Sequence, residues 1–313
     1  MTSKPDGDNR AQRQGTQRLP DSVQSLPISE CVADVVAAIR QSIPVVLKAP
    51  PGAGKTTGLP QVLLQTKCTG DGKILLVQPR RLAARAAASR IASVIGCRLG
   101  SAVGYHVRFD KCWSQQTKLI AMTTGVLLRK LHSDPLLEDV SCVLLDEFHE
   151  RNLEADLALG MLNRIRTTLR PELKLVVMSA TLDPGPISDF LGASCAVESQ
   201  GRAFPVEIHH ARQLTRQRIE QQVAEVLPEA LQNTDGDLLV FLPGVGEIHR
   251  AHRLIESMAC AANCEIKQLY GDMSPKAQDA VLAGSSERRI ILATNVAETS
   301  LTIPSVTGVI DTG

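Results

Sequence analysis

Short apolar stretches recur along the chain from Ile28 onward, separated by longer segments in which polar positions are mixed in. The apolar stretches are nearly continuous rather than alternating, which is typical of strands buried on both faces of a parallel sheet. Segments such as 80–95, RRLAARAAASRIASVI, resemble the helices that parallel strands need as crossovers. The pattern therefore predicts an α/β protein. Strands are expected at 44–49, 73–78, 117–124, 141–146, 173–180, 237–243, 265–270, 289–294 and 306–311.

The length of the chain predicts more than one domain. Its 313 residues exceed what one hydrophobic core usually serves, so two domains are expected. A break is expected near residue 200, where 198–210, ESQGRAFPVEIHH, contains a glycine and a proline. We therefore expect one α/β domain at 25–200 and another at 201–313. Residues 1–24 contain few apolar side chains and are expected to form a disordered tail.

Composition narrows the function only slightly. The net charge of +1 gives no electrostatic sign of a nucleic-acid partner, although a balanced total is compatible with a local basic groove. Aromatic residues make up 3% of the chain, which argues against an extended base-stacking platform. The eight cysteines contain no C-x-x-C pair and are expected to be reduced, structural thiols. No apolar stretch of about 18 residues and no signal core occur, so a cytoplasmic protein without membrane segments is expected.

Residues 48–60, KAPPGAGKTTGLP, lie between an expected strand and an expected helix and match G-x-x-x-x-G-K-[ST], with Ala49 at the first glycine. Glycines in such a loop let backbone N–H groups surround phosphate oxygens without Cβ clashes, and the helix N-terminus adds positive potential. Lys55 can reach the β- and γ-phosphates, and the Thr56 hydroxyl can bind Mg²⁺. The expected ATP-binding residues of this loop are Pro51, Gly52, Ala53, Gly54, Lys55, Thr56 and Thr57.

Residues 143–152, VLLDEFHERN, place a cluster of ionisable side chains at the end of another expected strand. Asp146 ends that strand as the Mg²⁺-holding carboxylate of a P-loop protein would, and Glu147 could then deprotonate water. A zinc site is an alternative, but H-E-x-x-H is absent and zinc needs three or four ligands. A charged turn after a buried strand is the simplest alternative.

The segment DEFHER at 146–151 resembles the DEAH box of superfamily-two helicases, with Phe148 where alanine is usual. QPRRLAARAAASRIA, MTTG, MSAT, LVFLPGVGEI, LYGDMSP and ATNVAETSLTIPSV resemble further motifs of the DEAH/RHA group, in the same order. Details in DEFHER, FLPGVGEI and GYHVRFD are most similar to bacterial HrpB-type helicases. The resemblance covers 27–313 and implies two RecA-like domains in tandem. It also implies ATP and Mg²⁺ as cofactors and single-stranded nucleic acid, RNA rather than DNA, as the partner of an ATP-dependent helicase.

The resemblance assigns roles residue by residue. Catalytic roles fall to Lys55, Glu147 and His149, and Mg²⁺ binding to Thr56 and Asp146. His149 would couple the nucleotide to Ser179, Ala180 and Thr181. Arg90 would lie over the adenine, although Leu282 replaces the opposing aromatic residue of the family and weakens the stacking. The implied nucleic-acid contacts are Arg80, Arg81, Thr123, Thr294, Asn295 and Thr299.

One family motif does not occur in the sequence. No Q-x-x-G-R-x-G-R segment is present, and in the family its arginines face the γ-phosphate. We therefore expect a truncated helicase core with an incomplete second domain, weak hydrolysis and no unwinding. A catalytically incomplete ATP- and nucleic-acid-binding fragment is an alternative, as is a P-loop kinase or GTPase. The kinase or GTPase would not explain MSAT or ATNVAETSLT.

Overall fold

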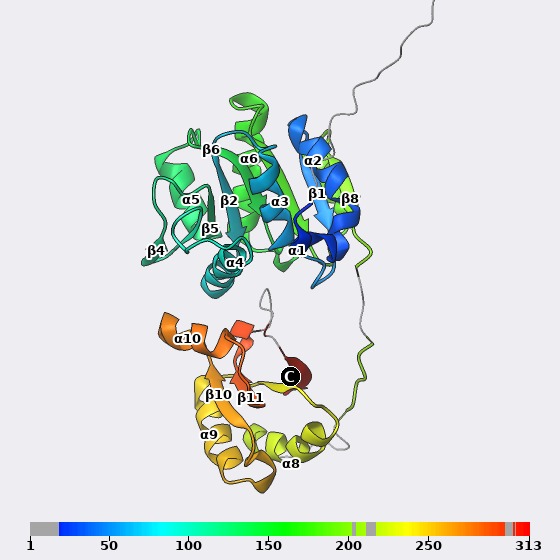
Figure 1. Ribbon diagram of the computed structural model, residues 1–313, viewed down its shortest axis with the longest axis vertical. Coiled ribbons are helices and arrows are strands. Elements are labelled where there is room, and N and C mark those ends of the chain that lie inside the picture. The colour runs from blue at the N-terminus through cyan, green and yellow to red at the C-terminus, as the bar shows by residue number, and fades with distance from the viewer. Residues whose placement is uncertain (1–18, 202–204, 211–216, 298–302, 304) are drawn as a thin grey trace, which may run out of the picture.

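The structure, a computed structural model, describes residues 19–201, 205–210, 217–297, 303 and 305–313 (Figure 1). These residues form an eight-stranded sheet and a four-stranded sheet, each with helices on both faces. The predicted class, two α/β domains in tandem with parallel sheets, is confirmed. Among the described residues, no helix is long and apolar enough to cross a membrane.

The sheet of the first domain has the order β4-β3-β5-β2-β6-β7-β1-β8. Every pairing in it is parallel except that between β3 and β4. The carboxyl ends of the parallel strands therefore meet at one edge, where loops can converge on a ligand. The strands are β1 (Val45–Lys48), β2 (Lys73–Gln78), β3 (Val103–Val107), β4 (Asp110–Cys112), β5 (Leu119–Thr123), β6 (Val140–Leu145), β7 (Lys174–Ser179) and β8 (Cys195–Glu198).

Helices bury the apolar residues of this sheet on both sides. Helices α2, α3 and α4 pack on one face, and α5, α6 and α7 pack on the other. The central strands are buried on both faces, which explains why their sequences are continuous apolar runs. The helices are α1 (Asp21–Gln24), η1 (Pro27–Glu30), α2 (Val32–Arg40), α3 (Gly58–Thr66), α4 (Arg81–Val94), α5 (Thr124–Ser133), η2 (Phe148–Glu150), α6 (Leu153–Thr168) and α7 (Pro184–Leu191).

The second domain is a smaller parallel sheet with the order β10-β11-β9-β12. Helices α8 and α9 pack on one face, and α10 packs near the other, where Leu82 of α4 joins the same apolar cluster. The elements are α8 (Ile219–Gln232), β9 (Asp237–Phe241), α9 (Val245–Glu256), η3 (Ala259–Ala261), β10 (Glu265–Leu269), α10 (Pro275–Leu282), β11 (Arg289–Ala293), η4 (Asn295–Ala297) and β12 (Val306–Asp311).

Two features differ from the sequence-based expectation. Strands β3, β4 and β8 were not predicted, because they lie at or near the sheet edges, where polar and half-buried positions interrupt the apolar run. The expected tail extends too far, since Asp21–Gln24 is helix α1 and Val23 is fully buried. Residues 1–18 of that tail lie outside the described residues. All eight cysteines lie in the described part of the chain, and none forms a disulfide.

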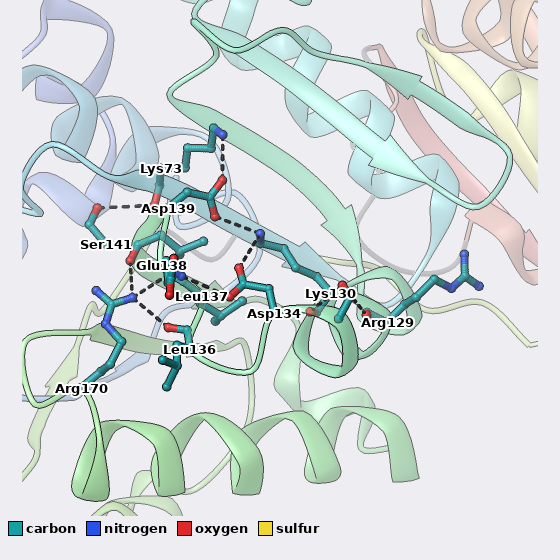
Figure 2. A network of polar contacts seen from close by, with 12 residues as sticks. Lys73, Arg129, Lys130, Asp134, Leu136, Leu137, Glu138, Asp139, Ser141 and Arg170 are labelled. Atoms are coloured by element: carbon teal, nitrogen blue, oxygen red, sulfur yellow. Dashed lines mark hydrogen bonds and ion pairs between the residues drawn. The ribbon is translucent and has the colours of Figure 1, made fainter.

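A network of polar contacts lies at the amino ends of the strands of the first sheet (Figure 2). Asp139, just before β6, accepts hydrogen bonds from Lys73 at 2.8 Å and Lys130 at 2.9 Å. Nearby, Arg170 donates to the backbone carbonyls of Leu136, Leu137 and Val140. These bonds fix the connection between α5 and β6 and so hold β6 in register.

Candidate active site and nucleic-acid face

The loop between β1 and α3 forms an anion-binding cradle. Gly52 and Gly54 have φ values of 78° and 96°, a region that favours glycine. A Cβ on Gly54 would lie 2.8 Å from Leu26 Cδ1, so a side chain there would also be crowded. No described residue accepts a hydrogen bond from the backbone N–H groups of Gly54, Lys55 or Thr56. These N–H groups remain available to phosphate oxygens.

Residues before the cradle support it. The N–H of Ile28 donates to the Ala53 carbonyl at 3.0 Å, and Leu26 and Ile28 pack over Gly54 and Gly58. The start of η1 therefore belongs to the packing around this loop, and Val23 of α1 also lies close to Gly58. The sign of this arrangement in the sequence is the apolar pair Leu26 and Ile28 on either side of Pro27.

Lys55 and Glu147 form a buried ion pair beside the cradle. Lys55 Nζ lies 3.1 Å from Glu147 Oε1, and the two side chains are only 6% and 8% exposed. Removing one partner of a buried pair leaves an uncompensated charge and typically costs about 3–5 kcal/mol. The geometry places the loop lysine next to the carboxylate that the sequence suggested as a base.

Thr56 and Asp146 meet from the loop and from the end of β6. The Thr56 hydroxyl donates to Asp146 Oδ2 at 2.6 Å, and Gln78 Nε2 donates to the same oxygen at 2.7 Å. Hydroxyl and carboxylate oxygens are the ligands that Mg²⁺ prefers. The residues present therefore fit this ion, with Gln78 orienting the carboxylate. Gln78 was not predicted as a site residue, although a buried amide at a strand end next to two arginines was a possible signal.

Glu147 has an uncommon backbone conformation. Its φ of 51° and ψ of 36° lie in the left-handed region, which few residues other than glycine adopt, and its N–H donates to Asp146 Oδ1 at 2.8 Å. Burial raises the pKa of Glu147, and the Asp146 carboxylate raises it further against the opposing charge of Lys55. The turn thus directs a carboxylate of raised basicity toward the phosphate loop.

His149 connects this box to the end of β7. Its Nδ1 accepts a hydrogen bond from the Ala180 N–H at 3.4 Å and lies 3.4 Å from Glu147 Oε2. Burial and then the charge of Lys55 lower the pKa of His149, so a neutral ring with an accepting Nδ1 is favoured. An uncharged imidazole therefore binds the SAT segment and lies beside the Glu147 carboxylate.

Ser179 ties β7 to the phosphate-loop strand. Its carbonyl accepts from the Ala49 N–H at 2.9 Å, and its hydroxyl accepts from the Leu182 N–H at 3.0 Å. Ala49, which replaces the usual glycine, is fully buried against this neighbour. Thr181 is exposed and makes no side-chain hydrogen bond to another described residue. Among the three SAT residues, Ser179 and Ala180 thus contact the nucleotide-site segments directly.

The residues predicted for nucleic-acid contact lie in different settings. Arg81 is exposed at the start of α4, whereas Arg80 Nη1 donates to the Asn295 carbonyl at 2.5 Å and its Nε lies 3.6 Å from Glu150 Oε2. Thr123 is buried at the end of β5. Thr294 is half-buried at the end of β11, and Asn295 is exposed. Thr299 lies outside the described residues.

The predicted adenine contacts are not brought together by any described interaction. Arg90 is exposed in the second half of α4. Leu282 ends α10 and packs, partly buried, on the second domain's apolar cluster. Nucleotide-base selectivity therefore stays a prediction.

Fold and site together define a class, the two-domain α/β proteins with a phosphate-loop motif at the carboxyl edge of the first sheet. Residues 29–190 match the family model described as DEAD/DEAH box helicase, and residues 204–313 match the helicase conserved C-terminal domain. The chain belongs to the DEAD/DEAH box helicase family.

Two curated relatives show where the similarity extends. The chain is 43% identical over 291 residues to the ATP-dependent RNA helicase HrpB of Escherichia coli, covering 92% of this chain and 36% of that protein. It is 37% identical over 295 residues to the ATP-dependent RNA helicase HrpA of the same organism, covering 92% and 22%. The chain thus spans about a third of the length of the first relative and less of the second.

A solved structure agrees with the fold. The crystal structure of the Escherichia coli DEAH/RHA helicase HrpB superimposes with a TM-score of 0.82 at 42% identity, covering 92% of this chain and 37% of that one. Two RecA-like domains in tandem, as predicted from the motifs, are therefore confirmed.

Proposed function

We propose that this chain is the ATP-driven core of an RNA helicase, which couples ATP hydrolysis to movement along single-stranded RNA and to duplex unwinding. One observation carries the proposal. A buried lysine–glutamate pair lies beside a loop whose backbone N–H groups remain available, with Thr56 and Asp146 in contact next to it. This arrangement fits a nucleoside triphosphate with its metal ion.

The loop N–H groups and Lys55 bind the phosphates of ATP, and Thr56 with Asp146 holds Mg²⁺. When bound, the ion would supply positive charge against the phosphate oxygens of ATP. Binding of the γ-phosphate draws the Lys55 ammonium away from Glu147. Because Lys55 is the group that lowers the pKa of Glu147, its departure makes Glu147 a stronger base for the attacking water.

The state of the nucleotide reaches the rest of the molecule through His149. A neutral Nδ1 accepts from the Ala180 N–H, and the neighbouring Ser179 carbonyl holds the Ala49 N–H at the start of the phosphate loop. A shift of Glu147 toward water would thereby move the end of β7. We assign the coupling role to His149, Ser179 and Ala180 on these contacts, and retain Thr181 as an exposed member of the same segment.

The proposed partner is single-stranded RNA. The relatives of this chain are named ATP-dependent RNA helicases, which supports RNA over DNA. Arg81, which is exposed at the start of α4, is proposed to contact backbone phosphate. The other residues proposed to contact the strand are Arg80, Thr123, Thr294, Asn295 and Thr299. Phosphate contacts position a strand without reading its sequence, so binding should depend little on base composition.

RNA-stimulated ATP turnover tests the proposal. ATP hydrolysis by the chain is measured with and without single-stranded RNA. RNA should raise turnover, and Arg81→Ala should weaken RNA binding equally for all sequences and reduce the salt slope by about 0.7. Arg98→Ala, an exposed arginine beyond the other end of α4, is the control. Turnover that ignores RNA would leave ATP binding without a helicase role.

A further inference from the structure

Helix α4 begins beside the nucleotide site and contacts the second domain, and Arg85 lies at the centre of that contact. Arg85 Nη2 lies 2.6 Å from Asp279 Oδ2 on α10, 194 residues away in the sequence. One turn earlier, Leu82 is buried within the apolar cluster of the second domain. Figure 1 shows α4 and α10 on the facing sides of the two domains. The start of α4 is therefore a contact surface between domains.

Arg85 has a second acidic partner within its own domain. Its Nε lies 3.7 Å from Asp110 Oδ2, and its guanidinium lies 5.9 Å from the centre of the Tyr105 ring. The Tyr105 hydroxyl donates to both Asp110 oxygens, at 3.2 and 3.1 Å. Tyr105 and Asp110 thus hold a carboxylate next to Arg85 that stays in place if Asp279 moves away.

The burial of Arg85 makes this second partner important. Its side chain is 9% exposed, whereas that of Asp279 is 57% exposed. While the second domain lies on α4, the buried Arg85 charge needs a counterion, and Asp110 and Asp279 both supply one. Because Asp110 remains as a counterion, the Arg85–Asp279 contact can break and re-form. A contact of this kind suits a domain movement that repeats in every ATP cycle.

The same helix is joined to the metal-binding carboxylate. Gln78, which donates to Asp146, lies two residues before Arg80, whose guanidinium contacts both Glu150 and the Asn295 carbonyl. A shift of Asp146 and Gln78 would therefore reach the start of α4 over one hydrogen bond and two residues of backbone. Such a path supports coupling only if substitution along it changes the coupling, which an experiment can measure.

We propose that Arg85 is a positioning residue: by binding Asp279 it sets the placement of the second domain on α4, and through that placement it couples the nucleotide site to RNA binding. Only the coupling of the nucleotide site to RNA binding rests on the proposed function. The placement of the domains by Arg85 follows from the contacts themselves and can be tested without ATP.

The variants are Asp279→Asn, Asp279→Glu, Arg85→Gln and the double variant Arg85→Gln with Asp279→Asn. Asp279 is exposed on α10, so its substitution leaves both cores intact. Glu247→Gln is the matched control, because it removes a carboxylate that pairs with Arg250 on the surface of the same domain. Amide hydrogen exchange of α4 and α10, measured without ligands, reports domain placement.

Asp279→Asn should speed exchange in 80–85 and 275–282, and Asp279→Glu should restore slow exchange. In 275–282, Arg85→Gln and the double variant should match Asp279→Asn, because each of the three variants lacks the contact between Arg85 and α10. Glu247→Gln should leave exchange in both segments unchanged. Equal exchange in the wild type and Asp279→Asn would overturn the proposal.

Coupling is measured as the ratio of RNA affinities with and without a non-hydrolysable ATP analogue. Asp279→Asn should lower this ratio about fivefold or more while leaving analogue affinity in the absence of RNA unchanged. An unchanged ratio with altered exchange would refute the coupling role of Arg85. A wild-type chain that fails to bind the analogue would refute the proposed function instead, and hydrogen exchange would then decide the placement role alone.

Discussion

The two ends of the first sheet carry the same residue types in opposite settings. At the carboxyl ends of the strands, Lys55 and Glu147 are 6% and 8% exposed. At the amino ends, Lys73 and Asp139 lie closer together, at 2.8 Å, yet Lys73 is 19% and Asp139 45% exposed (Figure 2). Contact distance alone would rank the second pair above the first.

The difference lies in burial and in backbone geometry. The buried end combines a glycine cradle, a left-handed glutamate and a raised carboxylate pKa. At the exposed end, burial acts to raise the pKa of Asp139, but hydrogen bonds from Lys73 and Lys130 lower this pKa below its ordinary value. Low exposure strengthens electrostatic interactions and perturbs proton affinity, whereas solvent screens an exposed pair. Charges of the same kind can therefore serve chemistry at one end and loop anchoring at the other.

The largest effect is expected for Glu147→Gln. The amide keeps the size of the side chain but cannot accept a proton from water, so ATP turnover should fall about 10²- to 10⁴-fold. Binding of ATP and RNA should persist. Steady-state hydrolysis and analogue titration measure the two properties separately. Asp139→Asn makes the same chemical change at the exposed end and should leave turnover at the wild-type rate. If Glu147→Gln hydrolysed ATP normally, Glu147 would not be the base.

Asp146→Asn should change the metal dependence of the site. The asparagine amide keeps the size of the side chain that Gln78 contacts but removes the negative charge near Thr56. Half-maximal ATP binding should therefore need about tenfold more Mg²⁺. The measurement is a Mg²⁺ titration at fixed ATP. Asp134→Asn, which removes a carboxylate bound to Lys130 at the other end, is the control. An unaltered Mg²⁺ requirement would remove Asp146 from the metal site.

The pH dependence should separate the two ends. Glu147 must be ionised to act as a base, and burial raises its pKa above the ordinary value of 4.5, so turnover should be lost as pH falls through that raised value. Asp139 has a pKa below its ordinary value of 3.8, so its contribution to stability is complete above that value and is lost only at lower pH. Turnover and thermal unfolding measured from pH 7 to pH 4 should therefore diverge, with activity failing first. Parallel loss of both would contradict the assignment.

Asp139→Ala should have the smallest effect. The side chain is nearly half exposed, so solvent screening limits its contribution and the free energy of unfolding should fall by about 1 kcal/mol or less. Affinity for ATP should not change. Urea denaturation and calorimetry measure the two quantities. A large loss of ATP affinity would mean that the amino ends of the strands influence the nucleotide site.

Much of the fold could be predicted from the sequence because strands buried in a parallel sheet have continuous apolar sequences. Each of the nine expected stretches overlaps an observed strand, β1, β2, β5, β6, β7, β9, β10, β11 or β12. Strands β3, β4 and β8 could not be found this way, since polar and half-buried positions interrupt the apolar run in each of them. Helix α1 was missed because one buried valine, Val23, among polar residues carries no periodic signal.

Candidate site residues were found where local geometry determines them. Gly52, Gly54 and Lys55 follow from the phosphate-loop spacing, and Asp146 follows from its place at a strand end. Contacts between segments distant in the sequence could not be found. The Arg85–Asp279 pair depends on how one domain lies on the other, and no local pattern encodes that placement. The hydrogen bond from Arg80 to the Asn295 carbonyl could not be predicted for the same reason.

The central claim is that the buried end of the first sheet, and not the exposed end, binds the nucleotide. Calorimetric titration of ATP with Mg²⁺ into the wild type, Lys55→Ala and Lys73→Ala tests it most directly. Lys55→Ala should bind about a hundredfold more weakly, because a charged hydrogen-bond donor to phosphate is lost, while Lys73→Ala should bind as the wild type does. Unchanged affinity in Lys55→Ala, or an equal loss in both variants, would contradict the claim.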